Sequence, residues 1–158
     1  FTNSGSSSAP TSGSGWGFTT DQLYLSTAGT SANYALRFYN DNGLVGSVLV
    51  NGSGVTYNTS SDYRLKENEV TISDAISKVK QLKPYTFNFK DDSSTKIDGF
   101  FAHEAQEVVS YAVSGEKDAE RMQSMDYGKL TPLLTAALQE AITKIETLEA
   151  DVAALKSN

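Results

Sequence analysis

Ser61 and Lys66 are the two residues of this 158-residue chain whose types and spacing could perform covalent chemistry. A serine hydroxyl is a weak nucleophile until a base takes its proton, and a lysine amine is that base in Ser-Lys variants of the catalytic triad. Ser61 could attack the carbonyl that precedes it, which would make Ser60 and Ser61 a cleavage site. The pair alone carries no information, so this interpretation depends on its position in the chain and on the residues after it.

The spacing of the pair also limits the local structure. In a regular strand Ser61 and Lys66 would lie on opposite faces, and in a helix they would lie about 140° apart around the axis. We therefore expect a turn between Asp62 and Leu65, or a contact between Ser61 and Lys66 of neighbouring subunits. A lysine amine has a pKa of about 10.4 in water, whereas a general base needs about 7 to 8 near neutral pH, so we expect assembly to bury the amine.

Several polar residues near the pair, or elsewhere in the chain, could support it. Asp62 could orient Lys66 or accept a backbone N–H, and the second role is favoured. Arg64 is expected to form a structural ion pair between subunits, and Asn68 is a further supporting candidate. His103 is the only histidine of a chain without cysteine, so we expect a hydrogen-bonded structural residue, no metal and no cofactor. Three acidic residues without paired spacing are expected to be solvated charges: Glu104, Glu107 and Glu116.

The composition changes abruptly at Ser61. Among 13 Lys and Arg and 19 Asp and Glu residues, only Asp21, Arg37 and Asp41 precede it, as do nine of the 12 Gly. Segments with such different solvation do not share one core, so two modules are predicted, residues 1–60 and 61–158. Modules of this size are marginal alone, which favours oligomerisation.

The first module is predicted to be rich in β-structure. Residues 1–15 contain mostly Ser, Gly and Thr and are expected to be a linker or an extended strand. Short strands are predicted over residues 22–26, 34–39, 44–50 and 55–57, with Asn- and Gly-rich turns at 40–43 and 51–54. Because these strands carry few large apolar residues, we expect strands of partner chains to complete the layers.

The second module mixes helices and strands. A helix is predicted to begin after an N-cap at Ser73 or Asp74 and to end at about Leu82. Strands over residues 85–89 and 99–102, a helical turn or two over 104–109 and a loop over 114–118 are expected to follow.

The chain ends in a heptad pattern that predicts a parallel homo-oligomeric coiled coil over about residues 130–157. The apolar positions of this seam are Leu134, Leu138, Ala141, Ile145, Leu148, Val152 and Leu155. β-Branched Ile145 and Val152 alternating with leucine favour two strands, whereas the small Ala141 leaves three open.

Charge and hydropathy exclude some classes of partner. The net charge of −6 argues against nucleic acid and anionic membranes. No segment approaches the roughly 18 apolar residues of a membrane span, and the first residues lack the pattern of a signal peptide. We therefore expect a soluble protein without membrane insertion.

Six blocks of the second module resemble one known family. They are SDYRLKEN (61–68), LKPYTFNF (82–89), GFFAHE (99–104), QEV (106–108), GEKDA (115–119) and DYGKL (126–130). This ordered set closely resembles the intramolecular chaperone of phage tail spikes and tail fibres, also called the S74 peptidase domain. Related versions occur in endosialidase tailspikes and in a membrane-bound transcription factor.

The resemblance implies a homotrimeric chaperone that holds three chains in register while the upstream fibre segment, its folding client, folds. It then releases itself as a single-turnover serine endopeptidase, with Ser61 as nucleophile and Lys66 as base. The implied fold class is α+β, with an intertwined trimeric β-structure before a small α/β chaperone domain and its coiled coil. The mature part would belong to the virion tail fibre, where a host-surface receptor would be its partner, and the chaperone would be released in the host cytoplasm.

Two alternatives stay open. The chain could be an uncleaved receptor-binding fibre tip, with Trp16, Tyr24, Tyr34 and Tyr39 forming its contact surface. Residues 61–158 could instead be a purely structural trimerisation module with a vestigial Ser-Lys pair. An intact mass would separate both from an autoprotease.

Overall fold

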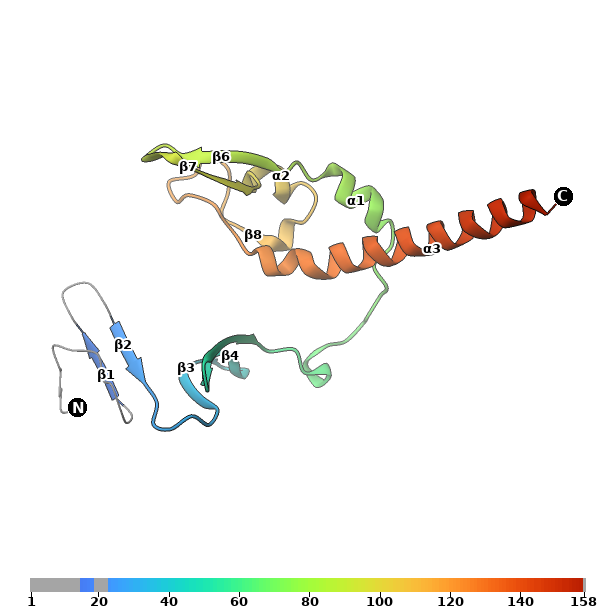
Figure 1. Ribbon diagram of the computed structural model, residues 1–158. Helices are drawn as coiled ribbons and strands as arrows, with labels where there is room; N and C mark the ends of the chain where they lie inside the picture. Colours follow the sequence, from blue (N-terminus) through green and yellow to red (C-terminus); the bar gives the residue numbers. More distant parts are fainter. Residues whose placement is uncertain (1–14, 19–22, 158) are drawn as a thin grey trace. The chain divides into compact units, whose positions relative to one another are not determined.

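The computed structural model of the chain describes residues 15–18 and 23–157. The chain divides into two compact units, Phe1–Glu69 and Val70–Asn158. It combines antiparallel strands with helices and ends in a long helix (Figure 1), as expected for the α+β class. The expected linker lies, apart from Gly15, outside the described residues, as does Gln22. The functional boundary between Ser60 and Ser61 stays a prediction.

The first unit consists of short antiparallel strands. Strand β1 (Gly15–Phe18) pairs with β2 (Leu23–Ser26). A second sheet has the order β3 (Asn33–Asn40), β4 (Gly43–Asn51) and β5 (Gly54–Thr59). The strands predicted over residues 34–39, 44–50 and 55–57 are confirmed. In the turn before β4, Asn42 N–H donates to Asn40 Oδ1 at 2.9 Å, and Gly43 adopts a φ of +92° that favours glycine.

One face of the three-stranded sheet is apolar and largely exposed among the residues that the structure describes. The register places Leu36, Val48 and Tyr57 in one cross-strand row, and Leu36 and Tyr57 are exposed. The opposite face carries Arg37, whose guanidinium lies 4.0 Å from the centre of the Tyr34 ring. Strands of partner chains, which the sequence predicts to complete the layers, would cover this apolar face. Their presence stays a prediction.

The second unit buries a small core between α1 (Ala75–Gln81), residues 105–112 and the N-terminal half of α3 (Thr131–Lys156). Figure 1 shows α1 alongside α3, whose C-terminal part continues beyond it. The buried residues are Ala75, Leu82, Ala105, Val109, Ala112, Leu130, Leu133 and Ala137. The helix predicted to end at about Leu82 is confirmed as α1. It packs one face on this core, with Ala75 and Leu82 buried and Ile76 and Val79 against them.

The capping of α1 differs from the prediction. Asp74 occupies the N-cap position, but it has a left-handed φ of +54° and its side chain does not cap the helix. Instead, Ile76 N–H donates to Oε2 of Glu140 on α3 at 3.1 Å. A carboxylate stabilises the positive end of a helix, so Glu140 performs the role expected of Asp74.

Strand β6 (Tyr85–Phe89) is confirmed, but its partner was not predicted. It pairs with the polar strand β7 (Asp92–Gly99) in a hairpin. The strand predicted over residues 99–102 is wrong, because Phe100 N–H leaves the ladder and donates to Tyr127 Oη at 3.2 Å. Gly99 permits this approach, since a Cβ there would lie 2.7 Å from the same oxygen.

The elements that come next are short. Helix α2 (Ala102–Gln106) begins earlier than the helical turns expected over residues 104–109. After the 3₁₀ helix η2 (Ser110–Ala112), β8 (Val113–Ser114) pairs with β9 (Ser124–Met125). The loop is therefore 115–123 and not 114–118.

The long C-terminal helix is confirmed as α3, which begins directly after the 3₁₀ helix η3 (Tyr127–Leu130). The adjacent residues Leu133 and Leu134 of α3 point to different sides of the helix, and 1% and 48% of their respective surfaces are exposed. The larger seam residues are exposed like Leu134, so α3 has one apolar face packed in the unit and a second one uncovered. Within the described part of the chain, no helix is both long and apolar enough for a membrane span. The coiled coil itself stays a prediction.

Candidate active site

Ser61 and Lys66 are brought together by a single 3₁₀ turn, η1 (Tyr63–Leu65). Leu65 N–H donates to the Asp62 carbonyl at 3.1 Å and Lys66 N–H to the Tyr63 carbonyl at 3.0 Å, which turns the chain back. As a result, Lys66 Nζ donates to Ser61 Oγ at 2.8 Å. Of the two routes that the sequence left open, the structure has the turn within one chain.

Asp62 fastens this turn. Its Oδ1 accepts from the backbone N–H and the Nε of Arg64, both at 2.9 Å, and its Oδ2 accepts from Arg64 Nη2 at 2.8 Å. The Arg64 guanidinium and backbone N–H hold the pKa of the Asp62 carboxyl below its ordinary value. Asp62 therefore has the favoured structural role. The ion pair of Arg64 is made within the same chain, and a pair between subunits stays a prediction.

On the other side of Ser61, Ser60 is tied to the start of β4. Its N–H donates to the Val45 carbonyl at 3.1 Å, and its Oγ donates to the Leu44 carbonyl at 2.8 Å. Neither carbonyl was among the predicted site residues, because a backbone acceptor occurs at every position and leaves no sequence signal. The bond between Ser60 and Ser61 lies beside an open hollow of about 410 Å³, lined by Leu44, Ser60, Ser61, Asp62, Arg64 and Leu65.

Comparison with known families identifies the segment that carries this geometry. Residues 61–114 match the family model Peptidase_S74, chaperone of endosialidase. The resemblance inferred from the sequence blocks is confirmed over these residues, and the match supports a phage tail-fibre chaperone domain. The blocks at 115–119 and 126–130 lie beyond the matched segment. No curated protein matches the chain.

In the segment that matches the S74 family, a serine hydroxyl and a lysine amine lie in direct contact. A lysine ammonium donates to the serine Oγ, and the same nitrogen can accept the hydroxyl proton once it has lost its own. Both Ser61 and Lys66 are exposed in the single chain. The burial of Lys66 expected on assembly therefore stays a prediction.

Asn68 lies at a bend shortly after the dyad. Its φ of +56° falls in the left-handed region, which asparagine tolerates better than most residues. The structure thus gives Asn68 a backbone role in the segment that follows the Ser61–Lys66 pair.

The other candidates from the sequence belong to the second unit. The His103 ring stacks on Phe101, with 6.1 Å between ring centres. Glu104 accepts from Lys83 Nζ at 3.0 Å, which lowers the pKa of Glu104, and its Oε2 is buried. Glu104 is therefore a structural ion-pair partner, and its prediction as a solvated charge was wrong. Over residues 15–18 and 23–157, no three acidic or histidine side chains gather in a way that could hold a metal ion.

Proposed function

We propose that residues 61–158 are the intramolecular chaperone and autoprotease at the C-terminal end of a phage tail fibre or tailspike. The domain trimerises, guides the folding of the upstream β-structured fibre and releases itself near Ser61. The observation that carries this proposal is the 2.8 Å contact between Lys66 Nζ and Ser61 Oγ inside a segment that matches the S74 family. The mature part remains in the virion, where it meets a host-surface receptor, and the chaperone is left in the host cytoplasm.

The proposed reaction uses the two residues in sequence. Lys66 Nζ takes the Ser61 hydroxyl proton while Oγ attacks the carbonyl carbon of Ser60. The C–N bond between Ser60 and Ser61 breaks, Lys66 returns the proton to the leaving amine, and the acyl group of Ser60 becomes an ester on Ser61 Oγ. Water then hydrolyses the ester, which leaves a carboxylate on Ser60 and a hydroxyl on Ser61. Because nucleophile and carbonyl belong to adjacent residues, no separate substrate pocket is needed.

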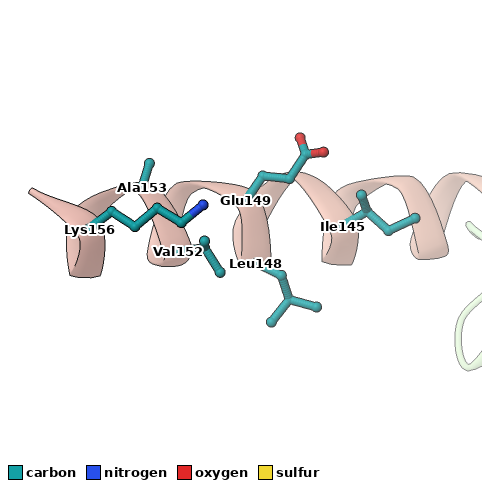
Figure 2. Close-up of a pocket in the computed structure, with 6 residues that line it drawn as sticks. All are labelled: Ile145, Leu148, Glu149, Val152, Ala153 and Lys156. Carbon is teal, nitrogen blue, oxygen red and sulfur yellow. The ribbon is translucent and has the colours of Figure 1, made fainter.

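The uncovered face of α3 supports the trimerisation step. Figure 2 shows Ile145, Leu148 and Val152 along the C-terminal part of this helix. With Glu149, Ala153 and Lys156 they form a mainly apolar stretch of the helix surface. A long exposed apolar stripe is unfavourable in water and is covered when helices of neighbouring chains pack together. The burial of Lys66 that is expected from the sequence would follow from the same assembly.

Two variants separate the chaperone role from the protease role. Ser61→Ala removes the nucleophile but no core side chain, so we expect an uncut trimer with a correctly folded first unit. Synthesis without residues 61–158 removes the element that sets the register, so we expect the remaining fibre to misfold or aggregate. Sedimentation and protease resistance measure both outcomes.

The results also discriminate against the alternatives. Soluble trimeric fibre from the deletion would refute the chaperone role. Normal cleavage of Ser61→Ala would refute the dyad and leave the chaperone role standing. A wild-type chain that stays intact in mature particles would favour an uncleaved receptor-binding tip with a purely structural trimerisation module.

A further inference from the structure

The peptide bond between Ser60 and Ser61 joins two segments that are held by different contacts. On its C-terminal side, Ser61 Oγ contacts Lys66 Nζ at 2.8 Å, and Asp62 caps the turn between them. On its N-terminal side, two hydrogen bonds tie Ser60 to β4. The Ser60 carbonyl, which Ser61 would attack, is therefore held in place through contacts with β4. The Ser61 hydroxyl is held in place through the turn η1.

The contacts of Ser60 exist only when β4 and β5 are paired. The ladder between the strands runs from Asn51 opposite Gly54 to Gly46 opposite Thr59. Ser60 N–H extends this ladder by one bond to the Val45 carbonyl at 3.1 Å. The 2.8 Å bond from Ser60 Oγ to the Leu44 carbonyl is additional, because it uses a side chain that a regular ladder does not need. An unpaired β4 would place neither carbonyl beside Ser60.

We propose that Ser60 is a positioning residue whose hydroxyl couples the rate of self-cleavage to the pairing of β4 with β5. The proposal rests on the autoproteolysis proposed above and adds a check on the folding of the upstream segment. Holding two reacting groups in a productive geometry lowers the barrier of a reaction, and a small displacement raises it. The hydrogen bond to Leu44 fixes the carbonyl side of the scissile bond only after the last sheet of the fibre segment has formed.

Ser60→Thr and Ser60→Val form a matched pair for the test. Threonine and valine have nearly the same shape, but only threonine can donate a hydroxyl hydrogen to the Leu44 carbonyl. The full chain is synthesised in a cell-free reaction with a pulse of label, and the conversion of precursor to product is followed in time. We expect Ser60→Thr to retain cleavage and Ser60→Val to be slower by about threefold to tenfold, the effect of one lost hydrogen bond. A ratio below about threefold overturns the proposal.

Three controls make each outcome interpretable. Ser60→Ala should be as slow as Ser60→Val, and a wild-type rate for Ser60→Ala overturns the proposal even if valine disturbs the strand. Asn58→Ala removes another side-chain bond between the same strands, to Ser47 Oγ at 3.4 Å, and should leave the rate unchanged. Amide hydrogen exchange in a Ser61→Ala background should show equal protection of β4 and β5 in the threonine and valine variants, and lost protection in the valine variant alone would reject positioning as the cause.

Ser61→Ala, measured in parallel, separates the two proposals. If Ser61→Ala is cut, the proposed function fails. If Ser61→Ala stays uncut while Ser60→Val matches Ser60→Thr, the dyad stands and only the role of the Ser60 hydroxyl is overturned.

Discussion

Lys66 Nζ lies 2.8 Å from Ser61 Oγ, across five positions of sequence. A base in this position must be able to lose its proton, and a guanidinium does not do so near neutral pH. We therefore expect Lys66→Arg to remain uncut although it keeps the positive charge. Lys80→Arg, at an exposed lysine of α1, is the matched control and should be cut normally. Denaturing electrophoresis of freshly folded protein measures both, and cleavage of Lys66→Arg at the wild-type rate would remove Lys66 from the mechanism.

The seam of α3 should control cleavage through assembly. Ile145→Glu combined with Leu148→Glu places carboxylates where helices are proposed to pack, which should cost several kcal/mol per chain and abolish the trimer and cleavage together. Thr143→Glu combined with Thr147→Glu adds the same charge outside the seam and should preserve both. Sedimentation and cleavage are measured on the same samples. A monomeric variant that processes itself at the wild-type rate would show that assembly does not switch on the dyad.

The adjacent Leu133 and Leu134 should affect different equilibria. Leu133 is buried in the second unit, so Leu133→Ala should lower the free energy of unfolding of that unit by about 2 to 5 kcal/mol. Leu134 is half exposed in the single chain, so Leu134→Ala should chiefly weaken association. Urea denaturation at several protein concentrations, in a Ser61→Ala background, distinguishes them. Only the effect of Leu134→Ala should depend on concentration, and an equal dependence for both would contradict the two-faced description of α3.

Glu140 should make the stability of the second unit depend on pH. Lys144 and the Ile76 N–H hold the pKa of Glu140 below its ordinary value. A carboxyl with a lowered pKa in the folded state stabilises that state at neutral pH, and this contribution is lost as the pH falls through the folded-state value. Glu140→Gln keeps an acceptor oxygen but loses the charge, so its Tm should be below that of the wild type at pH 7. Thermal unfolding should show this difference shrinking below about pH 4, and a constant difference would contradict the assignment.

Local patterns predicted much of this fold, and contacts between distant residues explain what they missed. Strand β6 was predictable because Tyr85, Phe87 and Phe89 alternate. Its partner β7 was not, because this strand is polar. At its first residue, Asp92 accepts hydrogen bonds from Thr95 and Ser94, which lower the pKa of Asp92 to about 2. The cap of α1 comes from Glu140, 64 positions after Ile76, and no local signal indicates it.

The candidate site also has features that local sequence predicted and features that it could not predict. The need for a turn between Asp62 and Leu65 could be inferred from the spacing of Ser61 and Lys66 alone, and η1 provides it. The spacing left contact within one chain and contact between chains open; the single chain has the first, and a contact between subunits stays a prediction. The carbonyls that hold Ser60 could not be predicted, because they belong to a strand that pairs with β5 only in the folded sheet.

The most direct test of self-cleavage at Ser61 is the intact mass of freshly purified full-length chain beside its Ser61→Ala variant. Self-cleavage predicts two fragments for the wild type, with the C-terminal one corresponding to residues 61–158 and starting at Ser61 by N-terminal sequencing. It predicts one uncut mass for Ser61→Ala. A single uncut mass for the assembled wild type, or the same two fragments from Ser61→Ala, would contradict self-cleavage by this dyad.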